Sequence, residues 1–392
     1  MLDSVADSSP MVTRLRQVGA SRVGRVGRAD TEHQEALRTA VVDRYRALDA
    51  IRRHSLRRTS FCRRKRIAAT VQLQLGSDGR PHFSGLETCG SVWACPVCAA
   101  IIMAERAREV TTFAERWREE GGHTYMLTCT ISHGLGHDLE AMRKGLAEAW
   151  RRFWQGRAAQ ERRRAWDIAH TVRSVEVTHG PHGWHPHTHT LLGTRRKLTE
   201  SDRYEMAMAW KAAVRAVLGS DHEPNVQNGV QLTESRQAEY LVKLGLETAQ
   251  ILTKGAHAGH RTSWQIMHDA AAGDARSVSL WRQYTQAMLG ARQLTWSRGT
   301  KRHFHLRNKT DKQIVDDDNP HSPVTHVMAE FQGKTWDAYS RRIRFWTSSV
   351  VAAAYSETPY SALRRLPGVK ERSPPGIVRP QCPTVEATTS HP

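Results

Sequence analysis

The sequence lacks several features that mark common classes of protein. It contains no run of about 18 or more apolar residues, the length that indicates a transmembrane helix. No apolar segment follows its first basic residues, so we expect no secretory signal. It has no internal repeat and no G-x-x-x-x-G-K-[ST] motif, so we expect no built-in ATP-driven helicase. These absences favour a cytoplasmic protein without a membrane partner.

Acidic residues are too few to balance the basic ones. The 392 residues include 58 Lys and Arg but only 39 Asp and Glu, which gives a net charge of +19. Such an excess favours binding to a polyanion, with nucleic acid as the first candidate and an anionic membrane surface as the second. The length is enough for two or three compact units, and the ordinary apolar content of 39% allows a sizeable core.

Cysteine is too scarce for a disulfide framework, and four of the six cysteines have the spacing of metal ligands. Cys95-x-x-Cys98 is the knuckle that places two thiolates on one edge of a zinc tetrahedron, and Cys89 and Cys62 can complete it. The alternatives are a redox pair, which needs a thioredoxin-like context that is not seen, or buried free thiols. His82 could replace one cysteine. A structural zinc site fits a reducing cytoplasm.

Residues 174–192 have the pattern of a β-hairpin. Residues 174–179 alternate and are β-branched, residues 180–183 (Gly-Pro-His-Gly) are a turn signal, and residues 184–192 continue as a second strand. His179 and His182 fall on the opposite face and in the turn, where we interpret them as bystanders or DNA contacts.

Three histidines share one face of the second strand. Alternate residues of a strand point the same way, which aligns His185, His187 and His189. If the hairpin closes on residues 181 and 182, Glu176 lies opposite His187, with Cβ atoms about 5 Å apart. Two imidazoles and a carboxylate then converge, which suits a divalent metal. The simpler alternative is an exposed polar face.

A tyrosine lies on the polar side of a predicted helix over residues 234–247. Tyr240, Lys243, Glu247 and Arg236 share this face, while small and apolar residues form the other. A lone tyrosine in such a place is usually a surface residue packing on a neighbour. Here a candidate metal motif lies upstream, and a lysine follows three residues later.

Residues 183–191, G-W-H-P-H-T-H-T-L, resemble the HUH motif of rolling-circle replication initiators and relaxases. The local pattern is most similar to G-W-x-P-H-x-H-x-L of plasmid Rep proteins from Gram-positive bacteria. The residue between the two motif histidines is usually bulky and apolar, and here it is Thr188. The resemblance implies that His187 and His189 hold Mg²⁺ or Mn²⁺ beside a scissile phosphate, with Glu176 or His185 as a further ligand.

Other segments resemble the same family in the same order. Residues 89–99, C-G-S-V-W-A-C-P-V-C-A, are similar to a string in Rep proteins of actinomycete plasmids, which also carry an upstream cysteine, as at Cys62. The strand predicted over residues 125–131 resembles the first Rep motif, and Tyr240-x-x-Lys243 the third. The resemblance implies that the four cysteines bind Zn²⁺, that Tyr240 is the nucleophile and that Lys243 stabilises charge beside it.

The implied activity is nicking of one strand at a plasmid origin. The tyrosine becomes linked to the 5′ phosphate, the free 3′-OH primes a polymerase, and the strand is later rejoined. Origin DNA, a host helicase and a host polymerase are the implied partners. In some relatives a glutamate four residues before the tyrosine ends the cycle; here that residue is Arg236, and Glu234, Glu239 or Glu247 could substitute. The alternatives are an HUH transposase or relaxase, and a non-catalytic, zinc-containing DNA-binding regulator.

The resemblance implies an α+β fold, with a central antiparallel sheet, flanking helices and a preceding zinc module. Residues 311–318 are acidic and polar and are predicted to be a linker. The expected domains are a basic arm and helix (1–57), a four-cysteine zinc module and helix (58–119), the nuclease domain (120–300), a C-terminal helical region (301–369) and a disordered tail (370–392).

Overall fold

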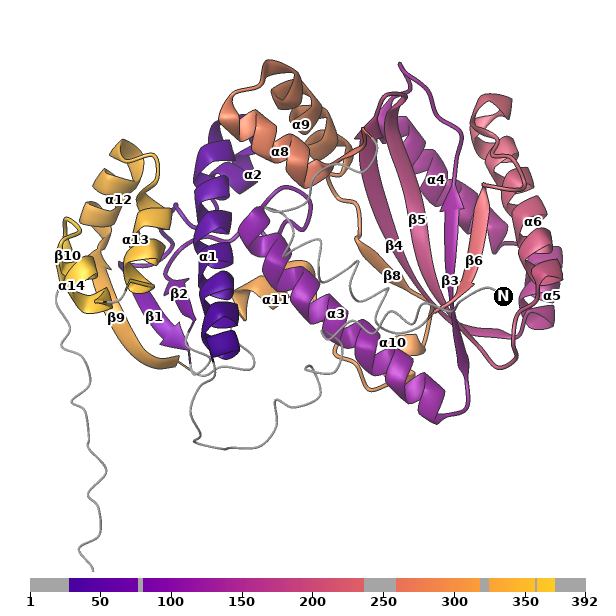
Figure 1. Cartoon of the computed structure of the whole chain (residues 1–392), viewed down its shortest axis with the longest axis horizontal. Coiled ribbons are helices and arrows are strands. Elements are labelled where there is room, and N and C mark those ends of the chain that lie inside the picture. Colours follow the sequence, from indigo (N-terminus) through magenta and orange to yellow (C-terminus); the bar gives the residue numbers. More distant parts are fainter. Residues whose placement is uncertain (1–27, 77–79, 236–258, 318–323, 357, 371–392) are drawn as a thin grey trace, which may run out of the picture. The chain divides into compact units, whose positions relative to one another are not determined.

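The computed structural model describes residues 28–76, 80–235, 259–317, 324–356 and 358–370 (Figure 1). The chain divides into two compact units. The first unit comprises Met1–Arg64 and Glu87–Asp318, and the second comprises Lys65–Leu86 and Asn319–Pro392. Because the second unit is assembled from two segments far apart in the sequence, two of its strands pair residues that lie more than 200 positions apart.

The first unit is built on an antiparallel sheet with the strand order β6-β3-β5-β4-β7, and β8 also pairs with β4. This confirms the predicted α+β class with a central antiparallel sheet. The long hairpin β4–β5 lies in its middle, as Figure 1 shows. The strands are β3 (His123–Thr130), β4 (Ile168–Gly180), β5 (Gly183–Thr194), β6 (Val230–Glu234), β7 (Arg261–Thr262) and β8 (Leu294–Trp296).

Aromatic residues cover one face of this sheet. Helices α4 (Leu139–Phe153) and α6 (Glu200–Leu218) pack on each other, and α4 also contacts β5. Trp150 and Trp210 join them, with ring centroids 6.4 Å apart. The indole of Trp210 donates a hydrogen bond to the backbone oxygen of Thr130, 2.7 Å away at the end of β3. A capping box formed by Thr199 and Asp202 starts α6.

The long helix α3 (Pro96–Glu119) covers one end of the other face. Its Phe113 and Trp117 pack on Val172 of β4 and Leu191 of β5, and these side chains are almost completely buried. Trp117 also donates a hydrogen bond from Nε1 to the backbone oxygen of His123. The residues on this face nearer the hairpin turn are polar, and the candidate site lies among them.

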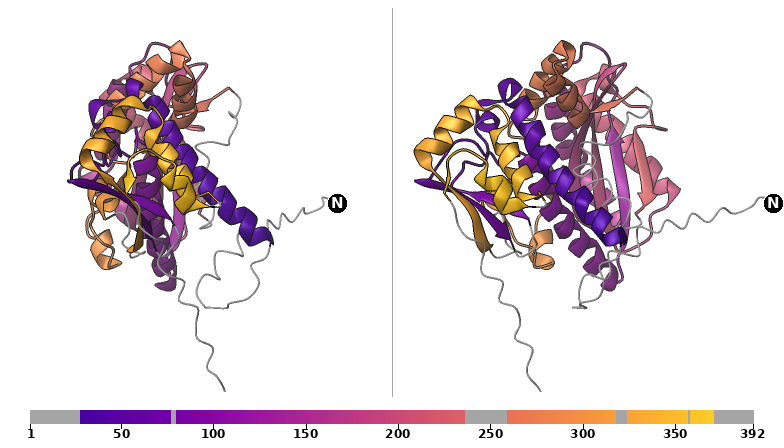
Figure 2. Two further views of the ribbon diagram at one scale, coloured as in Figure 1. Left: turned by 90° about the vertical axis from the view of Figure 1, so that its left-hand side faces the viewer. Right: turned by 60° about the vertical axis from the view of Figure 1, so that its left-hand side comes forward.

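The remaining helices of the first unit surround these elements. Helix α1, drawn in indigo in Figures 1 and 2, is a long helix that contacts α3 and α8. The helical segments are α1 (Arg28–Ile51), a 3-10 turn (Arg52–His54), α2 (Arg57–Ser60), α5 (Arg157–Ala165), a second 3-10 turn (Ser220–His222), α8 (Ser263–Ala272), α9 (Ala275–Ala287), α10 (Thr300–His303) and α11 (Asp311–Asp316).

In its described residues, the second unit is a four-stranded sheet, in the order β10-β9-β1-β2, with three short helices. Phe331 and Trp336 form its core with Trp346 and Phe83, and their rings pack edge to face. Its elements are β1 (Thr70–Gly76), β2 (Pro81–Ser84), β9 (Val324–Gln332), α12 (Gly333–Arg342), α13 (Trp346–Ala354), α14 (Pro359–Arg364) and β10 (Val369–Lys370).

The structure groups some segments differently from the expected domains. Residues 65–86, expected in the zinc module, pair instead with β9, which lies in the region expected to be helical. The predicted linker over residues 311–318 is wrong, because α11 occupies most of it. Thr310 caps this helix, and Asp311 pairs with Arg106 of α3 at 2.9 Å.

Candidate functional site

The hairpin has the register that the sequence predicts. Glu176 of β4 is the direct partner of His187 of β5, and the turn closes between Gly180 and Gly183. Gly183 has φ +90°, a backbone conformation that favours glycine. This two-residue connection fixes the register, and therefore decides which side chains share a face.

Glu176 and two histidines converge on the polar part of the sheet. Oε2 of Glu176 lies 3.1 Å from Nε2 of His187 and 2.8 Å from Nε2 of His189. The two imidazoles are nearly buried, with side chains 12% and 10% exposed. Burial raises the pKa of the Glu176 carboxyl, but hydrogen bonds with the two imidazoles prevail and hold that pKa well below its ordinary value of 4.5. The carboxylate is therefore ionised at neutral pH.

Each of the two imidazoles also makes a contact through Nδ1, on the side away from Glu176, and this contact orients the ring. Nδ1 of His187 lies 3.3 Å from the backbone oxygen of His185, and Nδ1 of His189 lies 2.9 Å from Oγ1 of Thr128 on β3. A carbonyl oxygen only accepts, so it favours the tautomer of His187 with the proton on Nδ1. Such contacts direct Nε2 toward a metal and fix the plane of the ring. The sequence predicted the strand 125–131 that carries Thr128, but it did not predict the contact of Thr128 with His189.

These three residues fit a divalent metal. One ligand atom from each of Glu176, His187 and His189 lies within 4.8 Å of the others. Metal–ligand bonds of about 2.0–2.2 Å place neighbouring ligand atoms roughly 3 Å apart, close to the separations seen here. Imidazole and carboxylate together suit ions such as Mn²⁺, and a set of three protein ligands leaves coordination positions for water or substrate.

His185 lies outside this group. Its ring stacks on that of His133, with centroids 4.5 Å apart and planes inclined by 10°. Burial, together with the nearby His187, His133 and His260, lowers the pKa of His185 from 6.5 to about 4. The geometry therefore favours Glu176 over His185 as the third ligand.

The predicted nucleophile lies outside the described residues. Tyr240 and Lys243 fall within 236–258, as do Glu239 and Glu247, and their roles stay predictions. Glu234, the remaining candidate for ending the reaction, is an exposed residue at the end of β6.

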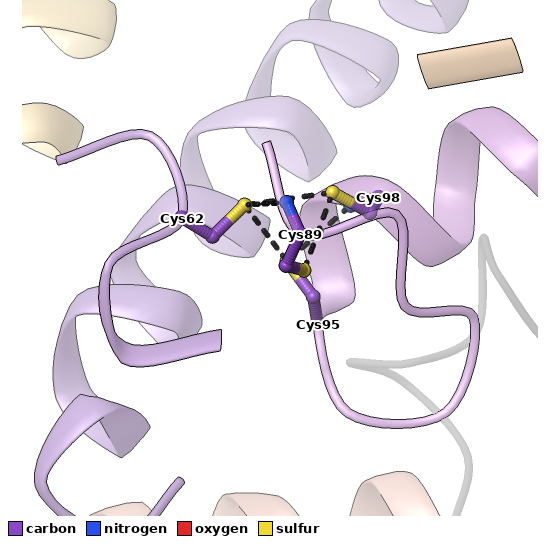
Figure 3. A group of neighbouring side chains, drawn as sticks. All are labelled: Cys62, Cys89, Cys95 and Cys98. Atoms are coloured by element: carbon purple, nitrogen blue, oxygen red, sulfur yellow. Dashed lines mark hydrogen bonds between the residues drawn. The ribbon is translucent and has the colours of Figure 1, made fainter. Parts of the chain in front are cut away.

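Four buried cysteines form a second cluster, as predicted. Figure 3 shows Cys62, Cys89, Cys95 and Cys98 with their sulfur atoms turned toward one another. Sγ of Cys62 lies 3.5 Å from that of Cys98 and 3.7 Å from that of Cys95, and Cys89 lies 3.6 Å from Cys98. Tetrahedral Zn²⁺ with Zn–S bonds of about 2.3 Å separates its sulfurs by about 3.8 Å, so the four thiols fit zinc. Hydrogen bonds from Cys89, Cys95 and Cys98 lower the pKa of Cys62.

The cluster lies where the chain leaves and re-enters the first unit. Cys62 precedes residues 65–86 and Cys89 follows them. The backbone N–H of Arg63 donates to the oxygen of Glu87 at 2.7 Å, beside the cluster. Arg52 donates to the backbone oxygen of Cys62 at 2.6 Å. A metal here would fasten these two passages of chain together, which is a structural role. His82, the alternative ligand, belongs to β2 of the second unit.

Comparison with known proteins assigns the chain to a family. The model of a family described as "Replication protein" matches residues 84–342, about two thirds of the chain. The chain belongs to this replication protein family. The match includes Glu176, His187 and His189, as well as three of the four clustered cysteines; Cys62 precedes it.

Two curated relatives from Streptomyces are similar to this replication protein. "Protein rep" of Streptomyces lividans is 30% identical over 287 residues, which cover 55% of this chain and 63% of the relative. A "Neomycin resistance protein" of Streptomyces cyanogenus is 31% identical over 146 residues, covering 30% of this chain and 33% of the relative. The matches thus span less than two thirds of either relative. No solved structure matches the chain. Within the described ranges, no helix has the length and apolar character needed to cross a membrane.

Proposed function

We propose that this protein initiates plasmid replication by nicking one DNA strand at the origin through Tyr240. The observation that supports this most directly is the convergence of Glu176, His187 and His189 on one face of the central hairpin, in a chain of the replication protein family. The net charge of +19 favours salt-dependent binding to the phosphate backbone. This function implies a cytoplasmic protein that works with a host helicase and a host polymerase.

The chemistry assigns a role to each side chain. Glu176, His187 and His189 would hold a divalent ion, which would supply charge stabilisation at the scissile phosphate. The Tyr240 oxygen attacks phosphorus and loses its proton; the bond from phosphorus to the 3′ oxygen breaks, and that oxygen takes up a proton. Lys243 would donate hydrogen bonds to the charged phosphate oxygens. The products are a 5′-phosphotyrosine and a free 3′-OH, and attack by that hydroxyl rejoins the strand without ATP.

The test is the formation of a covalent adduct. The purified protein is incubated with Mn²⁺ or Mg²⁺ and a supercoiled plasmid. This plasmid carries the gene that encodes the protein, together with the DNA that flanks the gene. Denaturing electrophoresis then reveals any DNA–protein adduct, and its 5′ end is mapped. We expect an adduct with the wild type and with Tyr204→Phe, an exposed tyrosine of α6, but none with Tyr240→Phe. An adduct with Tyr240→Phe excludes this nucleophile. No adduct with the wild type favours the non-catalytic regulator.

A transposase or relaxase would form the same adduct. The DNA element that the mapped 5′ end identifies separates these activities: a plasmid origin supports an initiator, whereas a transposon end or a transfer origin supports the alternatives.

A further inference from the structure

A cavity of about 240 Å³ opens beside the Glu176–His189 pair. Both residues line it, as do Thr128 and Ser174 from the same face of the sheet. Anything bound in this cavity therefore lies against the candidate metal site. Its volume falls just below the range of about 300–1,000 Å³ typical of pockets for drug-sized ligands, so it suits a smaller group such as a single nucleobase.

Aromatic side chains form much of the wall. Three aromatic residues line the cavity and are at least nine-tenths buried: Trp93 from the segment between Cys89 and Cys95, Trp264 from α8 and Tyr284 from α9. The indole of Trp93 donates a hydrogen bond to the backbone oxygen of Ala291 at 2.8 Å, which holds this ring in place. Rigid aromatic walls suit a flat ring, and stacking of a base on an aromatic side chain contributes about 1–3 kcal/mol.

Gln293 provides the polar group that identifies the occupant. It lines the cavity and is only 6% exposed. Its side-chain oxygen Oε1 accepts no hydrogen bond from any described residue. A buried acceptor without a donor costs about 1–3 kcal/mol, so the side chain favours an occupant that carries an N–H or O–H group. A phosphate or carboxylate anion has only acceptors, and a hydrocarbon has neither. A nucleobase offers N–H donors on a flat edge, and a glutamine amide can pair with such an edge in two places.

We infer that this cavity binds one base of the single DNA strand next to the scissile phosphate, and that Gln293 reads the edge of that base. The inference rests on the proposed function and makes it more specific. Enzymes that read an unpaired base commonly take it into a pocket between aromatic and apolar side chains and hydrogen-bond its Watson–Crick edge. Gln293 then acts as a specificity-determining residue, because the bond that it makes depends on which base enters.

The first experiment selects single-stranded oligonucleotides from a randomised pool, without added Mg²⁺ or Mn²⁺ so that no strand is cut. No chelator is used, because it would remove zinc from the cysteine cluster. Wild type, Gln293→Met and the control Gln286→Met, an exposed residue of α9, are compared. We expect wild type and control to enrich one shared motif, and Gln293→Met to lose about tenfold discrimination at one position of it. The inference is overturned if Gln293→Met enriches the same motif with the same discrimination as the wild type. It is also overturned if the wild type enriches no motif.

A second variant distinguishes a change in base preference from a general effect on folding. Gln293→Glu presents two acceptors, and guanine alone offers two adjacent donors on its Watson–Crick edge, so this variant should shift the preference at that position to guanine. A motif that weakens evenly at every position, in both variants, means a structural role for Gln293 and contradicts the inference.

Photo-crosslinking locates the base directly. An oligonucleotide with 5-iodouracil at the Gln293-dependent position should crosslink to the peptide that contains Trp93 or to the one that contains Trp264. A crosslink only elsewhere overturns the inference. The wild type is also tested for binding of free deoxynucleoside monophosphates. Tight binding that the selected strand does not compete away would mean that the cavity is a nucleotide site, and this result contradicts the inference. Adduct formation on plasmid DNA is measured separately, so failure of the cavity and failure of the nicking activity give different results.

Discussion

One carboxylate oxygen of Glu176 contacts the Nε2 atoms of both His187 and His189, at 3.1 and 2.8 Å. The substitution Glu176→Gln keeps a hydrogen-bonding oxygen in the same place but removes the negative charge, and a neutral amide is a poorer metal ligand. We expect the affinity for Mn²⁺ to fall at least about tenfold while the fold is retained. Titration followed by the electron paramagnetic resonance of free Mn²⁺ measures this. The control Glu161→Gln, on the exposed side of α5, should leave the affinity unchanged, and an unchanged affinity in Glu176→Gln would exclude this carboxylate as a ligand.

Thr128 should affect the same metal without being a ligand. Its hydroxyl lies 2.9 Å from Nδ1 of His189, and valine has nearly the same shape without the hydroxyl. We expect Thr128→Val to weaken Mn²⁺ binding by about 10–100-fold, since outer contacts of this kind orient the imidazole. Thr130→Val is the matched control, because Thr130 lies two residues along β3 and, among the described residues, its hydroxyl donates to the backbone oxygen of Asn228, at 3.4 Å, rather than to an imidazole. Equal losses in the two variants would contradict the assigned role.

The cysteine cluster should hold one zinc ion that stabilises the fold. Cys62→Ala removes one of its four thiols, whereas Cys129 is buried in β3 and belongs to no cluster among the described residues. We expect Cys129→Ala to retain one zinc per chain and Cys62→Ala to lose it, with a melting temperature lower by more than about 5 °C. Elemental analysis and thermal unfolding test this. Full zinc content in Cys62→Ala would mean that another residue completes the site.

The hairpin and the cysteine cluster were predictable because local rules decide both. A two-residue turn between Gly180 and Gly183 allows one register, and that register alone puts Glu176 opposite His187. The spacing of Cys95 and Cys98 likewise defines a knuckle before any tertiary structure is known.

Features that depend on distant contacts were not predictable. The acidic residues of 311–318 suggested a solvated linker, but Asp311 pairs with Arg106, which lies 205 positions earlier and is buried. Arg106 also pairs with the buried Glu109, which in turn accepts from Lys301. The cavity also depends on distant contacts, since Trp93 and Gln293 line it together only after the chain has folded. The role of Tyr240 as the nucleophile stays a prediction.

His170 should make the protein sensitive to mild acid. Its ring lies among the aromatic side chains of the α3 core, with centroids 4.9 Å from Trp117 and 5.0 Å from Phe304, and its Nδ1 lies 3.1 Å from Oγ1 of Thr300. Burial, and then the charge of His303, lowers its pKa from 6.5 to about 4, against an opposing contribution from Glu120. The folded state therefore resists protonation of this ring.

The direction in which stability changes with pH follows from the lowered pKa of His170. Below about pH 6.5 the unfolded chain binds a proton at His170, but the folded protein does not until about pH 4, so stability falls as the pH falls through this window. The two pKa values correspond to a loss of about 2 kcal/mol between pH 7 and pH 5, and because the ring is only half-buried, solvent screening reduces the expected loss to about 1 kcal/mol. Urea unfolding at both pH values should show that loss in the wild type and in His268→Gln, an exposed control on α8. In His170→Gln, which keeps a hydrogen-bonding group but cannot titrate, the loss should be smaller by that amount; an identical loss in all three proteins would mean that the His170 ring is protonated equally easily in the folded and unfolded states.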